Sequence, residues 1–355
     1  MTHAAHTRPT HRLAGWLAGL CLALTAAPAL AELLSFGLLG DVYMTREHEG
    51  YLKGMLDDMA DKNESLAIFT GGIKSVEQGC QDSTLLAAYP VFAKAPLPTF
   101  YVPGDADWLL CAKFAPEERL NLLRKTYYQS DRSLGDPSLP LIRQAAHPEL
   151  MRWESGPALF VTLSVTGSNN HRGDNEDASS EFTERSTANL AWLSAAFAKA
   201  VESQMSMLVI VMYGDPEFAQ PGVSEPSRGY VSLLDLLKTE TATFPGQVLL
   251  VHGGGGVHRI DHPLINPANN LPYQNFTRVE TYGALQQGWV EVRIERNDKA
   301  GNDPVRRTEF KFESFPWPPL SLDNMPPAEP APKEPTTLPL PPESGTPSAA
   351  AAPGK

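Results

Sequence analysis

The sequence predicts an α/β domain, and three observations support this prediction. Short apolar runs end repeatedly in glycine or aspartate, segments with helical spacing lie between them, and the composition is that of a globular protein, with 42% hydrophobic and 20% charged residues among 355. A chain of this length can bury a large core. Because the carboxyl ends of parallel strands meet at one edge of a sheet, functional side chains are expected where these runs end.

Residues 1–31 are predicted to be a secretory signal peptide. Arg8 and Arg12 precede an apolar run over 13–24, and the small-residue pattern at 28–31 is typical of cleavage after Ala31. The alternative is a retained membrane anchor, which needs about 20 apolar residues. We therefore expect a secreted, periplasmic protein without stable membrane insertion after signal cleavage.

The first half of the mature chain repeats one pattern, in which a buried strand ends in a turn and a helix follows. Strands are predicted at 33–39 and 66–70, and a third begins at Pro98 and ends in a turn by Asp107. Helices are predicted at 47–62, 84–92 and 116–128. Residues 130–148, rich in Pro, Ser and Asp, are expected to form a surface excursion.

The second half continues with a predicted hairpin over 153–165 and a polar loop over 167–174. Asn169 and Asn170 in this loop either bind a polar ligand or form a surface turn. Helices at 183–205 and 230–237 and strands at 207–212 and 248–252 follow, and 289–294 alternates like a half-exposed strand near a sheet edge. We place the domain at 32–314, followed by a disordered tail rich in proline and alanine at 315–355.

The charge and the cysteines limit the possible partners and the compartment. A formal charge of −12 and a pI near 5.2 argue against binding to nucleic acid or anionic lipid. Cys80 and Cys111 remain after signal cleavage, and in an oxidising compartment we expect them to form a disulfide, the alternative being two buried free thiols.

The strand at 248–252 ends at His252 and breaks into four glycines at 253–256. Glycine lacks a Cβ, so such a loop lets another group approach its backbone closely. Its amides can hold an anion or form a tight turn, but the loop offers no side chain to a metal.

Four short strings follow predicted strands, namely G-D-V-Y at 40–43, G-G at 71–72, G-D-A-D at 104–107 and G-G-G-G at 253–256. In this order they resemble the motifs D-x-H, G-D, G-N-H-[DE] and G-H-x-H of the calcineurin-like metallophosphoesterases, and especially of a secreted bacterial branch. The resemblance implies a sandwich of two mixed β-sheets flanked by helices, and phosphoester hydrolysis at two metal ions.

The departures from these motifs fall on the metal ligands. Asp41, Asp105 and Asp107 match the pattern, whereas the bridging carboxylate, the leaving-group residue and the imidazoles are replaced. The substituted positions are Tyr43, Gly72, Ala106, Gly254 and Gly256. We therefore expect no cofactor, and a non-catalytic binding or interaction module whose partner is an unknown envelope protein or a small phosphorylated ligand.

The alternative is an active phosphoesterase with an altered site for one metal ion. Asp41, Asp105, His252 and His258 would then hold Mn, Fe or Zn, ions that accept two imidazoles and two carboxylates. This alternative, a hydrolase for phosphate mono- or diesters, requires the four side chains to converge on one point.

Overall fold

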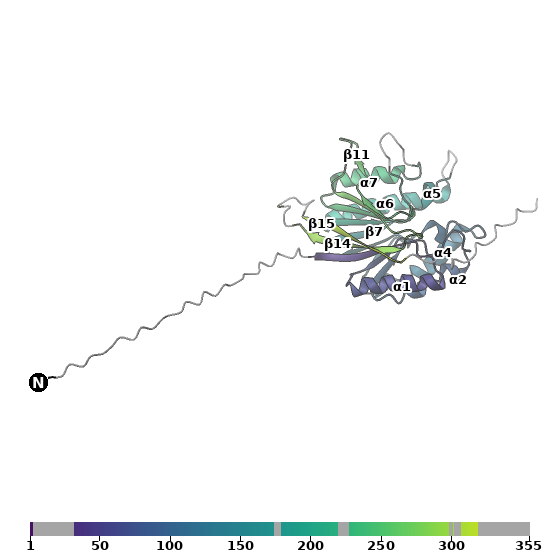
Figure 1. The fold of residues 1–355 in the computed structure, drawn as a ribbon. Coiled ribbons are helices and arrows are strands. Elements are labelled where there is room, and N and C mark those ends of the chain that lie inside the picture. The colour runs from purple at the N-terminus through teal and green to yellow at the C-terminus, as the bar shows by residue number, and fades with distance from the viewer. Residues whose placement is uncertain (3–31, 174–178, 219–226, 298–300, 302–306, 319–355) are drawn as a thin grey trace, which may run out of the picture.

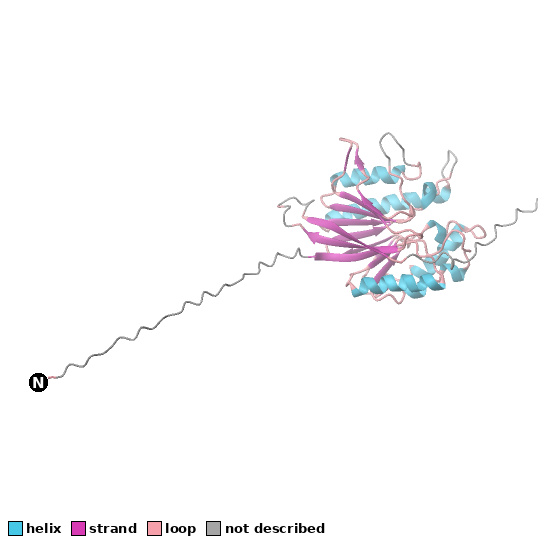
Figure 2. Ribbon diagram, viewed as in Figure 1, coloured by secondary structure: helices cyan, strands magenta, loops and turns pink. Residues whose placement is uncertain are grey.

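The computed structural model describes residues 1–2, 32–173, 179–218, 227–297, 301 and 307–318. Within them, two large β-sheets pack face to face and helices cover the outer face of each sheet (Figures 1 and 2). Nearly all of the predicted signal peptide and tail lies outside the described residues. Among the residues described, no helix combines the length and the apolar character needed to span a bilayer.

The six-stranded sheet has the strand order β15-β14-β1-β2-β3-β4. Its parallel centre comprises β1 (Glu32–Leu39), β2 (Ala67–Phe69) and β3 (Pro98–Tyr101). The antiparallel strands are β4 (Leu134–Gly135), β14 (Gly288–Arg296) and β15 (Thr308–Pro316). The helices that follow its strands are α1 (Arg46–Asp61), α2 (Asp82–Leu85), α3 (Tyr89–Phe92) and α4 (Pro116–Tyr127).

The seven-stranded sheet has the order β10-β13-β9-β8-β7-β6-β5. Parallel strands β7 (Ala158–Thr162), β8 (Met207–Val211), β9 (Gln247–His252) and β13 (Phe276–Glu280) form its centre. The others are β5 (Ile142–Arg143), β6 (Met151–Ser155) and β10 (Arg259–Asp261), and β11 (Ile265–Asn266) and β12 (Leu271–Pro272) form a separate pair. The helices are α5 (Gly167–Asn170), α6 (Ser180–Glu202) and α7 (Val231–Thr243).

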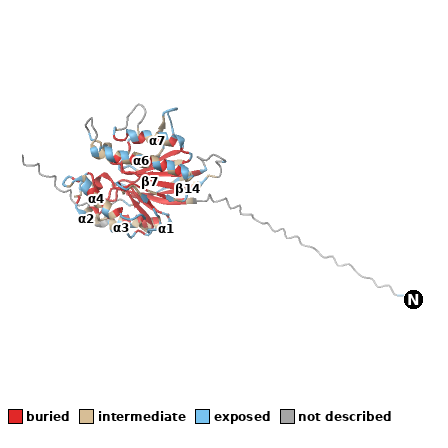
Figure 3. Ribbon diagram, turned by 180° about the vertical axis from the view of Figure 1, so that it is seen from behind, coloured by how far each residue is buried: buried red, intermediate tan, exposed pale blue. Residues whose placement is uncertain are grey.

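The core fills both faces of the seven-stranded sheet. On β8, Val209 faces the other sheet, whereas Leu208 and Ile210 face α6 and α7. Phe36 of β1 and Phe160 of β7 meet across the two sheets, with ring centroids 5.2 Å apart. Burial on both faces explains why these strands are continuous apolar runs, and Figure 3 shows the buried sheets inside partly exposed helices.

The predicted α/β sandwich of two mixed sheets flanked by helices is confirmed. The predicted disulfide is also confirmed, since Cys80 and Cys111 are bonded with their Cα atoms 5.7 Å apart. The disulfide joins the loops that follow β2 and β3. The predicted helix at 84–92 consists of two short helices, α2 and α3.

The strand predicted at 289–294 near the sheet edge is present as β14, next to the edge strand β15, but the prediction that it is half-exposed was wrong. β14 lies between β1 and β15, so Trp289 and Val290 are fully buried. The sequence analysis missed β15, and it also missed β13. Because β15 runs to Pro316 and the Trp317 amide donates to the Gln287 carbonyl (2.8 Å), the fold continues past residue 314.

Candidate functional site

The loops that follow the parallel strands of both sheets meet at one edge of the sandwich. Asp41 follows β1, and its backbone N–H donates to the carbonyl of Gly71, which follows β2 (2.8 Å). The 3-10 turn Asp105–Asp107 follows β3. We call Asp41, Asp105 and Asp107 the aspartate cluster, since each lies near the charge of another.

Asp107 holds the loops after β2 and β3 together. Its fully buried carboxylate accepts hydrogen bonds from the backbone N–H groups of Gly72 (3.0 Å), Ile73 (2.9 Å) and Gly104 (2.7 Å) and from the Tyr101 hydroxyl (2.8 Å). Burial nevertheless raises the pKa of Asp107 to about 6. A carboxylate can accept about four hydrogen bonds. The four groups named above therefore occupy the acceptor sites of Asp107.

Asp41 and Asp105 are also bonded within the protein. The Tyr213 hydroxyl donates to Asp41 Oδ1 (3.3 Å), and the backbone N–H of Gly254 donates to the same carboxylate. Burial, followed by the charge of Asp107, raises the pKa of Asp41 to about 7. Asp105 Oδ1 accepts from the Ala106 N–H (2.9 Å), and burial raises the pKa of Asp105 as well.

The ring of Tyr213, which follows β8, lies among the glycines of three loops. A Cβ added to Gly71 would lie 2.6 Å from the ring, and one added to Gly104 would lie 2.9 Å from it. The corresponding distances for Gly254 and Gly253 are 3.3 and 3.4 Å. Part of the four-glycine loop therefore packs against the protein's own tyrosine, which is the close approach that the glycines predicted.

Gly72 packs equally closely against Asp41. A Cβ at residue 72 would lie 2.1 Å from Asp41 Oδ1, and the backbone there has φ +79°, a conformation that favours glycine. A carboxylate side chain at this position does not fit beside Asp41. Burial and the charge of Asp41 raise the pKa of Tyr43 above its usual value, so its phenol stays neutral. Glycine offers no ligand atom at residue 72, and a neutral phenol is a poor ligand for a divalent ion.

The alternative single-metal set is not brought together in the described part of the chain. The one group there of three or more potential ligands within 4.8 Å of one another contains His252 but neither Asp41 nor Asp105. His258 uses one ring nitrogen to contact the Glu280 carbonyl (2.8 Å) and the other to contact Ser314 Oγ (2.8 Å). Both nitrogens of His258 are therefore engaged away from the aspartate cluster.

The group that does form comprises Asp215, His252 and Glu280, which we call the Asp215 cluster. His252 and Glu280 are the last residues of β9 and β13, and Asp215 lies in the loop after β8. Burial lowers the pKa of His252 to about 4 and raises the pKa of Glu280. Arg259 Nε lies 2.6 Å from Glu280 Oε2, and Arg259 Nη2 pairs with Asp215.

Sequence analysis missed Glu280 because it missed β13. The segment reads Phe-Thr-Arg-Val-Glu, with β-branched residues at 277 and 279, which is the available signal for a strand. Arg278 and Glu280 are buried in the fold although both are charged. Charged residues at buried positions do not give the alternation of apolar and polar residues by which a half-buried strand is recognised.

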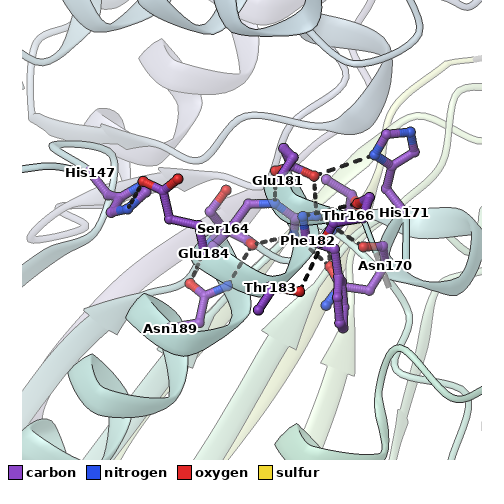
Figure 4. Close-up of polar contacts among 12 residues, drawn as sticks. His147, Ser164, Thr166, Asn170, His171, Glu181, Phe182, Thr183, Glu184 and Asn189 are labelled. Atoms are coloured by element: carbon purple, nitrogen blue, oxygen red, sulfur yellow. Dashed lines mark hydrogen bonds and ion pairs between the residues drawn. The ribbon is translucent and has the colours of Figure 1, made fainter. Parts of the chain in front are cut away.

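The predicted polar loop is a left-handed turn over 168–171, where each residue has φ between 48° and 59°. Asn170 is buried, and its side-chain oxygen accepts a hydrogen bond from Arg185 Nη1 of α6 (2.6 Å). The side-chain oxygen of Asn169 accepts one from the Gly229 N–H (2.7 Å). Figure 4 shows the polar contacts around Asn170, His171 and Glu181. Both asparagines thus hold the turn in place.

No protein-family model matches the sequence, and no curated protein matches it. Three solved structures with a similar fold are a dimetal phosphatase from Danio rerio, the Plasmodium protein GAP50, described as the anchor in the inner membrane complex, and a purple acid phosphatase from yellow lupin. Their identities to this chain are 12%, 13% and 10%, and their TM-scores are 0.48, 0.45 and 0.43. The matches cover 80%, 79% and 78% of this chain and 100%, 88% and 53% of the respective structures.

Proposed function

We propose that this chain is a secreted protein with a metallophosphoesterase-like fold that has lost the dinuclear metal centre and acts as a non-catalytic binding or interaction module. The observation that carries the proposal is the packing of the glycine loops. The Tyr213 ring lies against Gly71 and Gly104, and Gly72 lies against Asp41. A side chain larger than glycine would meet protein atoms at each of these three positions.

The chemistry of the family supports the same proposal. Two-metal phosphoester hydrolysis needs a carboxylate that bridges both ions, so that the metals polarise the phosphoryl group and activate water. Residue 72 is a glycine whose Cβ position is taken by Asp41. Asp107 already accepts four hydrogen bonds from the fold, so its use as a ligand would leave buried donors unpaired, at about 1–3 kcal/mol each.

The partner we propose is an envelope protein or a small phosphorylated ligand. The predicted signal peptide and the Cys80–Cys111 disulfide support an oxidising compartment outside the cytoplasm. The formal charge of −12 disfavours nucleic acid.

The test is hydrolysis by the mature protein, secreted from the full-length chain and purified without chelator. We expect no turnover of p-nitrophenyl phosphate or bis-p-nitrophenyl phosphate above the buffer rate with Mn²⁺, Fe²⁺ or Zn²⁺. The matched variants are Asp41→Asn and Asp105→Asn, with His171→Gln, whose ring lies beside Glu181, as the control. Turnover that disappears in the two aspartate variants and persists in the control would establish the alternative, an active phosphoesterase.

A further inference from the structure

The Asp215 cluster shares no residue with the aspartate cluster, and it is built from the last residues of two neighbouring parallel strands and the loop after a third. One ligand atom from each of Asp215, His252 and Glu280 lies within 4.8 Å of those of the other two. His252 and Glu280 are fully buried, and the Asp215 side chain is 24% exposed. β8, β9 and β13 are adjacent in the sheet, so the backbone holds the three residues close together.

His252 presents an unpaired nitrogen in this cluster. Its Nδ1 lies 2.7 Å from the Gly253 carbonyl oxygen, which can only accept a hydrogen bond, so Nδ1 carries the proton. In the neutral imidazole, Nε2 then carries a lone pair, and this atom is buried without a hydrogen-bond partner. A buried lone pair beside two carboxylates is unfavourable unless a cation lies between them.

We infer that Asp215, His252 and Glu280 bind one divalent transition-metal ion of the Zn²⁺, Mn²⁺ or Fe²⁺ class. One imidazole nitrogen and two carboxylates are ligands that these ions accept. The bond from Nδ1–H to a backbone carbonyl is the support that metal-bound histidines usually have. Three protein ligands leave a coordination position for water or for a group from a partner.

Arg259 supplies the competing positive charge in the absence of metal. Its guanidinium pairs with both Asp215 and Glu280, and its side chain is 40% exposed, so it can turn toward solvent when a metal binds. Arg278 is held by Asp261, with Nη2 and Oδ2 2.5 Å apart, and lies 3.7 Å from Asp215. A divalent ion would balance the two carboxylates without Arg259.

The inference is tested by titrating the mature protein with Co²⁺, followed by its visible d–d absorption, and with Zn²⁺ by calorimetry. We expect one equivalent to bind. Glu280→Gln and His252→Gln should each weaken binding by about 100-fold, since both remove a ligand. His171→Gln, whose ring lies 3.4 Å from Glu181, should bind as the wild type does.

Arg259→Met keeps the inference testable if the ligand variants fail to fold. This change removes the competing cation, so Co²⁺ should bind about tenfold more tightly, a gain that misfolding cannot produce. No Co²⁺ binding, binding unaffected by Glu280→Gln, or no gain in Arg259→Met would each overturn the inference. Hydrolysis lost in Asp41→Asn would contradict the proposed function instead, so the two failures are distinguishable.

Discussion

Because protein atoms pack closely around Asp41, we expect substitution by alanine to lower the free energy of unfolding more at Gly72 than at Gly256. Gly72 and Gly256 have nearly the same φ, +79° and +78°. A Cβ at Gly72 would lie 2.1 Å from Asp41 Oδ1 and 2.8 Å from Asp41 Cα, whereas a Cβ at Gly256 would meet nothing within 4 Å. Gly72→Ala and Gly256→Ala are therefore a matched pair in which only the steric surroundings differ.

The shared cost comes from the left-handed backbone, which disfavours a side chain by about 1–2 kcal/mol. The unfolded chain loses similar freedom in both variants, so that effect cancels in the difference. Overpacking against Asp41 adds about 1–3 kcal/mol at residue 72 alone. Asp41 cannot easily give way, because it is buried and accepts a hydrogen bond from Tyr213. We expect Gly256→Ala to cost about 1–2 kcal/mol and Gly72→Ala about 2–5 kcal/mol.

The measurement is equilibrium urea unfolding of both variants and the wild type, followed by circular dichroism, with the slope of the transition checked for equality. Equal free energies of unfolding for the two variants would refute the reasoning. The space beside Asp41 would then be able to accept a side chain, and the steric argument against a bridging carboxylate would fail.

Three further predictions concern the same edge of the sandwich. Tyr213→Ala should lower the free energy of unfolding by about 3–5 kcal/mol in urea, because it leaves a cavity among the glycine loops; a loss below about 1 kcal/mol would mean that the ring is not packed there. Burial raises the pKa of Asp41 from 3.8 to about 7, so the folded protein retains a proton that the unfolded chain releases. The contribution of Asp41 to stability is therefore greatest below pH 4 and is lost as the pH rises to about 7, by up to about 4 kcal/mol. Asp41→Asn should flatten this dependence in unfolding measured between pH 4 and 8, and an unchanged profile would contradict the assigned cause. Reduction of the Cys80–Cys111 disulfide, which closes a separation of 31 residues, should cost roughly 3–4 kcal/mol, and the double variant Cys80→Ser/Cys111→Ser should then be insensitive to reductant.

Strands that are buried on both faces can be predicted from the sequence, because such strands appear as continuous apolar runs. β8 is an example, with Val209 facing one core cluster and Ile210 the other. β13 and β15 could not be recognised in this way. β13 carries buried Arg278 and Glu280, and their burial depends on partners that are distant in sequence or come from another strand. β15 is an edge strand whose alternating charged residues are typical of exposed segments.

The candidate site was predictable only in part, for a similar reason. The spacing of the glycines indicates that some group approaches the loops, and the structure identifies that group as Tyr213. Tyr213 follows β8 of one sheet, whereas Gly71 and Gly104 lie in loops after β2 and β3 of the other. No pattern within a short stretch of sequence predicts that they meet. The alternative metal site was expected to include both His252 and His258. Their spacing in the sequence does not reveal that the ring of His258 contacts Ser314 instead.

The packing at this edge of the sandwich requires glycine at residues 71, 72 and 104, because a Cβ there would lie closer than 3 Å to other protein atoms. Each glycine costs conformational entropy, about 0.5–1 kcal/mol relative to alanine in regular structure. The burial of the Tyr213 ring, of the order of 1.5–3 kcal/mol for a large apolar side chain, offsets part of that cost. Because Gly72 is fitted to Asp41, and Asp41 is bonded to Tyr213, a carboxylate at residue 72 cannot be accommodated unless Asp41 moves. In the function that we propose, a dinuclear centre would require several coordinated changes in these loops, whereas the metal proposed for the Asp215 cluster would require only the displacement of Arg259, whose side chain is 40% exposed.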